Sequence, residues 1–143
     1  MPDDRPSLSG QVSALPRLLD QLRRAWDDFS LTELVVLAAV AENEGVTVAG
    51  LARLCRLTDA TASRTIRRLA PPDMPGALRP ARGLMMLMRG PTDNRSRYVF
   101  LTPLGRETCR SLDQIVADRS LPPLLKPTID SRAFAALRIP AQG

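Results

Sequence analysis

The stretch that decides the fold is TVAGLARLCRLTDATASRTIRRL, residues 47–69. Thr47 can cap a short helix and Thr58 a second one, because a hydroxyl accepts hydrogen bonds from the free N–H groups that begin a helix. Each predicted helix has one apolar face, formed by Val48, Leu51, Ala52 and Cys55 on the first and by Ala62, Ile66 and Leu69 on the second. Two short helices with arginines exposed on the second are typical of a helix-turn-helix, although an ordinary helical hairpin shares the pattern.

A β-hairpin is predicted after these helices. Pro71 and Pro72 end the second helix, and the runs LMMLMR (84–89) and RYVFLT (97–102) have the length and composition of strands. The seven residues between them, GPTDNRS, favour a turn. A hairpin in this position is a wing. The predicted fold class is therefore mainly α with a small β-hairpin wing (α+β), a winged helix-turn-helix.

Further helices are predicted on both sides of this unit. Residues 11–28 carry leucines at helical spacing: Leu15, Leu18, Leu19 and Leu22. Ser30 and Glu33 form a capping box for a helix that ends before Gly45, with an expected apolar face of Leu34, Leu37, Ala38 and Ala41. Thr102 and Pro103 begin a last long helix, bounded by Pro122, that carries Leu104, Leu112, Ile115 and Val116. A short helix is also predicted at Arg132–Arg138.

The composition limits the function classes that fit. With 143 residues, of which 44% are hydrophobic, the chain can bury one compact core. Its longest apolar run, residues 34–41, is far shorter than the roughly 18 residues that a membrane span needs, so we expect a cytoplasmic protein. The chain has no histidine, and Cys55 and Cys109 are not spaced as paired metal ligands. We expect no enzyme activity, no catalytic residue, no cofactor and no metal site.

Positive charge is concentrated in the middle of the chain. Residues 53–110 contain twelve arginines against four acidic residues, a net charge of +8, whereas the rest of the chain carries −3. A basic segment between acidic ends is typical of a chain that presents one face to a polyanion, although a solvated surface can have the same imbalance. Only one basic residue, Lys126, is a lysine. Arginine suits bidentate contacts with phosphate and guanine.

At this point the sequence resembles the MarR (multiple antibiotic resistance regulator) family. The most specific segment is DNRSRYVFLTPLG, residues 93–105, which matches the pattern Asp-x-Arg-x-x-x-Val-x-Leu-Thr-x-x-Gly. The resemblance extends over roughly residues 31–112, with a weaker similarity in the first helix. It implies a winged helix, a homodimer built from the first and last helices, and repression of transcription that a small-molecule effector relieves.

Three features depart from the family pattern. Arg56 occupies the turn position where the family usually has glycine, which would cost on the order of 1 kcal/mol if its φ is positive. About ten extra residues lie within APPDMPGALRPARG, residues 70–83, and residues 76–79 are a competing start for the first strand. The last helix and tail are short and interrupted by prolines, so the details of the dimer interface are left open.

The candidate DNA-binding residues lie on the second helix of the pair and on the wing: Thr58, Ala60, Thr61, Ser63, Arg64, Arg67, Arg68, Asp93, Asn94, Arg95 and Arg97. Helical geometry places most of the first seven away from the apolar face, and Arg64 is positioned to reach the O6 and N7 atoms of guanine. The resemblance suggests that Arg95 enters the minor groove and that Asp93 orients it. The alternatives are a solvated arginine face and an Asp-Arg pair that only stabilises the turn.

Other side chains have weaker functional readings. Cys55 and Cys109 are interpreted as inert residues rather than redox sensors, Cys55 because it shares an apolar face. Trp26 and Phe29 are candidates for an effector pocket, although an ordinary packing role is favoured.

The predicted organisation is a flexible N-terminus (1–10), a dimerisation helix (11–29), a winged helix-turn-helix DNA-binding domain (30–106), and a C-terminal dimerisation helix with its tail (107–143). The expected function is a sequence-specific transcription regulator, a repressor that binds an inverted-repeat operator in double-stranded DNA as a homodimer, with no membrane partner. The alternative is a winged-helix module for protein interaction or DNA architecture that does not discriminate between sequences.

Overall fold

The computed structural model describes residues 8–91 and 95–118, with side chains from Ala14 onward. Its elements follow in the order α1 (Leu8–Ala25), α2 (Leu31–Glu42), β1 (Val46–Thr47), α3 (Val48–Cys55), α4 (Asp59–Leu69), β2 (Met85–Arg89), β3 (Arg97–Leu101) and α5 (Pro103–Ala117). The helix expected at 11–28 therefore begins and ends three residues earlier. The helix predicted at Arg132–Arg138 lies outside the described residues.

The four predicted N-caps are confirmed. Ser30 accepts a hydrogen bond from the Glu33 N–H at 3.1 Å, and the Glu33 carboxylate accepts one in return from the Ser30 N–H at 3.3 Å. Thr47, Thr58 and Thr102 each accept from the N–H three residues further on. These caps set where α2, α3, α4 and α5 begin.

The predicted hairpin is present, and it belongs to a three-stranded antiparallel sheet in the order β1-β3-β2. Met85 pairs with Leu101 and Arg89 with Arg97, which fixes the register of β2 against β3. The sequence did not indicate β1, because a strand of two residues has no periodicity to detect. The competing strand start at residues 76–79 is wrong, since β2 begins at Met85.

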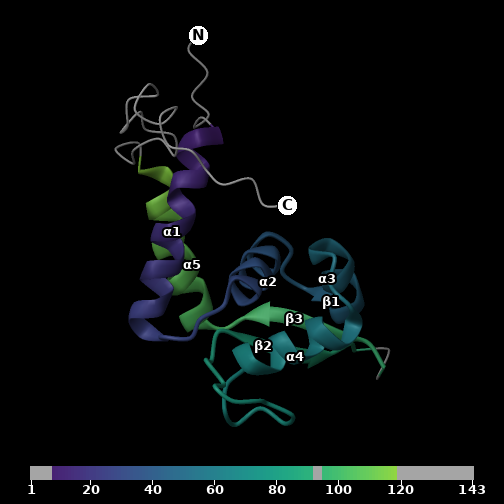
Figure 1. Ribbon diagram of the computed structural model, residues 1–143. Helices are drawn as coiled ribbons and strands as arrows, with labels where there is room; N and C mark the ends of the chain where they lie inside the picture. Colours follow the sequence, from purple (N-terminus) through teal and green to yellow (C-terminus); the bar gives the residue numbers. More distant parts are fainter. Residues whose placement is uncertain (1–7, 92–94, 119–143) are drawn as a thin grey trace, which may run out of the picture.

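The core lies between α2, α3, α4, the sheet and α5, and it continues to Leu22 on α1. Its largest fully buried side chains include Leu37, Leu51, Ile66, Leu84 and Val99. Figure 1 shows α1 and α5 side by side as a pillar that stands away from the helices around the sheet. The helix pair and the hairpin thus form one body, with the two expected dimerisation helices at one side.

The expected apolar face of α2 needs a correction. Leu34 and Leu37 are buried as predicted, but Ala38 and Ala41 are exposed, and Val36 and Val40 are buried instead. Residues 34–41 are apolar without interruption. Such a run contains no polar residue to mark the solvent side, so the helix phase could not be fixed from the sequence.

The segment between α4 and β2 is a loop that closes on the end of α4. Four of its backbone N–H groups donate to α4 or to Ala70: Leu78 to the carbonyl of Arg67, Arg82 to that of Arg68, Leu84 to that of Leu69, and Gly83 to that of Ala70. The last carbonyls of a helix have no partner within the helix. The loop therefore satisfies them, and the chain returns to the sheet where it left the helix.

Candidate nucleic-acid interface

The second helix of the pair, α4, presents a basic face opposite its buried one. Arg64 and Arg68 are exposed, while Ala62, Thr65, Ile66 and Leu69 are buried. Among the other nominated residues, Thr58 and Ala60 are exposed, and Thr61, Ser63 and Arg67 are half-buried. The helical phase predicted for α4 is therefore correct, with Thr65 as an additional buried residue.

Two of the nominated hydroxyl groups already have partners within the helix. The Thr58 hydroxyl donates to Thr61 Oγ1 at 2.9 Å, and its oxygen accepts from the Thr61 N–H at 3.1 Å. These bonds hold the first turn of α4 together. Thr58 is therefore engaged as a cap, and Ser63 and Arg64 stand further along the exposed side of the helix.

The turn between α3 and α4 contains the left-handed residue that the sequence suggested. Arg56 has φ 55° and ψ 43°, and the Leu57 N–H donates to the Ala52 carbonyl at 2.8 Å. A residue with a Cβ atom is strained in this conformation. The turn nevertheless keeps the short connection that sets α4 across the end of α3.

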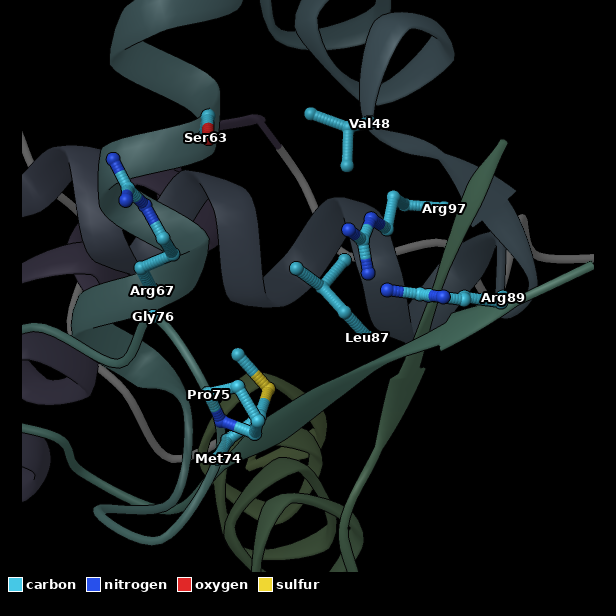
Figure 2. A pocket seen from close by; sticks show the side chains of 9 residues that line it. All are labelled: Val48, Ser63, Arg67, Met74, Pro75, Gly76, Leu87, Arg89 and Arg97. Atoms are coloured by element: carbon cyan, nitrogen blue, oxygen red, sulfur yellow. The ribbon is translucent and has the colours of Figure 1, made fainter. Parts of the chain in front are cut away.

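The hairpin places a second group of arginines opposite α4. Arg89 and Arg97 are directly opposed across β2 and β3, and both are exposed. Figure 2 shows the two side chains reaching from the sheet toward α4, which carries Ser63 and Arg67. Arg97 was predicted from the sequence as a DNA-binding residue, but Arg89 was not. The sequence does indicate Arg89, because Arg89 and Arg97 flank the predicted turn symmetrically.

A cleft of about 650 Å³ lies between these two elements. Its lining combines arginines and a hydroxyl with apolar side chains: Val48, Ser63, Arg67, Met74, Pro75, Gly76, Leu87, Arg89 and Arg97. Met74 and Pro75 belong to the extra loop, which forms one wall of the cleft (Figure 2). The cleft is thus bounded by α4, the hairpin and the loop.

The arginines on and beside this cleft have no acidic partner within the described residues. Across residues 8–91 and 95–118, no ion pair involves Arg64, Arg67, Arg89 or Arg97. The buried Nε atom of Arg67 has no hydrogen-bond partner there. Like charges directly opposite in a sheet repel each other, so the Arg89–Arg97 pair favours an anion between them. The arrangement suits a polyanion that follows the helix and the hairpin.

The tip of the hairpin is only partly within the described residues. Arg95 is exposed at its descending side. Asp93 and Asn94, both nominated from the sequence, lie outside the part of the chain that the structure describes. The predicted orientation of Arg95 by Asp93 stays a prediction.

Trp26 and Phe29 pack around an arginine from the extra loop. Their ring centroids are 5.8 Å apart, and the Arg82 guanidinium lies 4.9 Å from the Phe29 centroid and 6.0 Å from that of Trp26. Phe29 is fully buried and Trp26 half-buried. These contacts give both rings a packing role, which the sequence favoured over an effector pocket.

The two cysteines are half-buried, and among the described residues no basic group lowers the pKa of either thiol. Burial raises the pKa of Cys55. Burial, followed by the carboxylates of Asp113 and Glu44, raises the pKa of Cys109 to about 11. Both thiols are thus neutral at physiological pH. Within the described residues, no cluster of three or more cysteine, aspartate or glutamate side chains could hold a metal ion, and no helix is long and apolar enough to cross a membrane.

Comparison with known proteins finds a family model that matches part of the chain and solved structures with the same fold. Residues 27–70 match a family model described as the MarR family, whereas no curated protein sequence matches the chain significantly. Among solved structures, MarR from E. coli shares 21% identity, covers 76% of this chain and 71% of its own, and has a TM-score of 0.54. The S. aureus MepR–DNA complex shares 18% identity over 71% and 74% of the two chains, with a TM-score of 0.56.

A third match is Streptococcus pneumoniae FabT, which was solved in complex with DNA and shares 17% identity with this chain. The match covers 70% of this chain and 66% of FabT, with a TM-score of 0.54. At these identities the structural matches establish the winged helix-turn-helix fold. The family model spans part of the connection between α1 and α2, followed by α2, β1, α3 and α4. Residues 27–70 are thus similar to the MarR family, and the described chain has the winged helix-turn-helix fold of the solved structures it matches.

Proposed function

We propose that this protein is a transcription regulator that binds duplex DNA through α4 and the β2–β3 hairpin. The observation that carries the proposal is the group of arginines on both sides of the cleft, which have no acidic partner among the described residues. MepR and FabT, which share the fold, were solved with DNA. Their complexes support the same use of the fold here.

The two elements have different tasks in this proposal. Arg64 is exposed near the middle of α4, where a side chain inserted in the major groove reaches the edges of bases. Arg89 and Arg97 face the cleft from the hairpin and contact the sugar-phosphate backbone beside that groove. Arg95, closer to the tip, enters the adjacent minor groove, where the negative potential is strongest.

The active form is proposed to be a homodimer that binds an inverted repeat. Each half-site takes one α4, and a two-fold axis between the chains matches the two-fold symmetry of the DNA site. Exposed apolar side chains on the α1–α5 pillar, Leu15 and Val116 among them, support pairing through these helices. A dimer bound across a promoter blocks transcription, so we propose a repressor.

Selection from a random duplex library, followed by fluorescence anisotropy, tests the proposal. The expected result is an inverted repeat that binds at least about a thousandfold more tightly than a random duplex of the same length. Affinity for both duplexes should fall steeply with salt, because each neutralised phosphate releases counterions. Equal affinity for the selected and random duplexes would instead favour the module that does not discriminate between sequences.

A further inference from the structure

The buried side chain of Arg82 is the strongest feature that DNA contact does not explain. Its side chain is 1% exposed, and its Nε and Nη2 atoms donate to the two carboxylate oxygens of Glu33, which is itself 6% exposed. Nη2 also donates to Asp28 at 3.0 Å. Trp26 and Phe29 pack around the guanidinium as described above. A bidentate pair of this kind fixes direction as well as distance.

The guanidinium stays charged in this environment. Burial by itself would lower the pKa of Arg82, but the hydrogen bonds and charges of Glu33 and Asp28 outweigh it, so the net pKa is raised. The same contact, first through its hydrogen bond, lowers the pKa of Asp28. Arg82 is therefore charged, and Asp28 ionised, throughout the physiological pH range.

Arg82 joins the end of α4 to the connection between α1 and α2. Its backbone N–H donates to the Arg68 carbonyl at 3.0 Å, at the end of α4. Its side chain holds the junction between α1 and α2, because Asp28 lies between these helices and Glu33 belongs to the first turn of α2. One residue thus links the end of the DNA-facing helix to the base of the pillar.

Capping alone does not require this residue. Gly83 and Leu84 already return the chain to Ala70 and Leu69 by backbone hydrogen bonds, so a short turn could satisfy the same carbonyls. A buried ion pair also contributes little to stability compared with well-packed apolar side chains, whereas it can enforce one geometry. The contacts of Arg82 therefore favour a role in geometry over one in stability.

We propose that Arg82 is a positioning residue that fixes the angle of α4 relative to the α1–α5 pillar and thereby sets the spacing of DNA half-sites that the protein accepts. The inference rests on the proposed function, because two pillars joined in a dimer would hold two copies of α4 at a defined separation. Inserting or deleting one base pair between the two half-sites rotates one half-site relative to the other by roughly 35° and shifts it along the DNA axis by about 3.4 Å. A rigid link makes such a change costly.

The test compares the parent with Arg82→Met/Glu33→Gln. The double variant removes the ion pair without leaving a buried carboxylate unpaired, and the glutamine oxygen can still accept from the Ser30 N–H. A matched control, Asp73→Asn/Arg79→Met, neutralises two exposed side chains of the same loop, also without a change in net charge. Each protein is titrated with the selected inverted repeat, with repeats lengthened or shortened by one base pair, and with a single half-site.

The parent and the control should lose about tenfold or more in affinity when the half-site spacing changes by one base pair. The double variant should lose less than about threefold. Its affinity for the single half-site should equal that of the parent. A double variant that retains the tenfold loss overturns the proposal. Should it fail to fold, Arg82→Lys replaces it. A lysine keeps the charge but cannot make the bidentate contact, so an unchanged spacing preference in that variant also overturns the proposal.

Hydrogen exchange on the free proteins separates this inference from the proposed function. The amide of Leu78 donates to the Arg67 carbonyl in α4, and that of Gly83 to the Ala70 carbonyl directly after it. Both should exchange faster in Arg82→Met/Glu33→Gln than in the parent and the control. Unchanged exchange at these amides overturns the link. A parent that selects no DNA sequence would instead refute the proposed function, and the exchange result would still decide whether Arg82 restrains α4.

Discussion

At the scale of single residues, Arg56 shows how a chain can keep a turn whose backbone suits another amino acid. Its φ of 55° lies in the left-handed region, where a side chain costs roughly 1 kcal/mol. We predict that Arg56→Gly raises the free energy of unfolding by about 1 kcal/mol in urea titrations. Arg56→Ala removes the same charge but keeps the Cβ atom, so it should bring no such gain. A gain of equal size in both variants would show that charge, not strain, is responsible.

Arg64 and Arg89 allow base and backbone contacts to be separated. Arg64→Ala should weaken binding to the selected operator by about 1 to 3 kcal/mol and have much less effect on a random duplex. Arg89→Ala should weaken both by similar factors and lower the salt slope by about one unit. Anisotropy titrations at several salt concentrations measure both effects. The reverse pattern would mean that the roles of helix and hairpin are exchanged.

The raised pKa of Cys109 predicts how the reactivity of its thiol depends on pH. Its pKa is raised to about 11, so the neutral thiol is the form that the fold favours. The stability that this shift contributes is complete below the unfolded value near 9 and is lost as the pH rises toward 11. In a Cys55→Ser background, alkylation of Cys109 by iodoacetamide should be slow at pH 7 and accelerate about tenfold per pH unit up to that range.

Because both thiols are unreactive at physiological pH, oxidants should not affect DNA binding. Peroxide treatment should leave the affinity of the parent, Cys55→Ser and Cys109→Ser unchanged. Release of the parent from DNA by peroxide, abolished in either variant, would identify that cysteine as a sensor.

At the scale of secondary structure, sequence patterns predicted the features that depend on hydrogen bonds between residues close in sequence. The four hydroxyl caps and the hairpin follow from residues within a few positions of each other, and each is present. The phase of α2 failed, because its uninterrupted apolar run does not distinguish the side that faces the core. The strand β1 was missed for the complementary reason, since its two residues are a strand only through their pairing with β3.

The junction of α5 with the sheet depends on one glycine. A Cβ atom at Gly105 would lie 1.9 Å from the Leu84 carbonyl oxygen, so the helix can approach β2 only without a side chain there. Gly105→Ala should therefore destabilise the protein by about 3 kcal/mol or more. Gly83→Ala is the control, because its positive φ adds strain of about 1 kcal/mol but its surroundings are open. Equal losses in thermal unfolding would show that the contact at Leu84 relaxes easily.

At the scale of the whole molecule, the least predictable features join residues that are distant in sequence. Glu33 and Arg82 are 49 positions apart, and the sequence marks Glu33 only as part of a capping box. Within the candidate interface, the arginines of α4 could be predicted from the helical phase, and Arg97 from its position beside the turn. The cleft, with Met74 and Pro75 as a wall, depends on the path of the extra loop. That path is fixed by backbone bonds to α4 that composition does not reveal.

The pillar of α1 and α5 exposes apolar side chains that could pack against a second copy of the chain. Leu15 on α1 and Val116 on α5 are 41% and 40% exposed, and the two helices lie side by side, away from α3 and α4 (Figure 1). Apolar side chains on such a pair suit an interface with a second copy, because their burial would contribute favourable free energy. We predict a homodimer in sedimentation velocity at micromolar concentration.

Charge placed on the pillar should dissociate this dimer. Leu15→Glu/Val116→Glu should sediment as a folded monomer, because the two carboxylates would be desolvated at the interface. Its affinity for the inverted repeat should fall far more than its affinity for a single half-site, since only the former needs both chains at once. The matched control is Leu54→Glu, which replaces a leucine that is 56% exposed on α3, a helix that lies away from the pillar (Figure 1). A parent that sediments as a monomer, or a control that dissociates as readily as the pillar variant, would place the interface elsewhere or remove it.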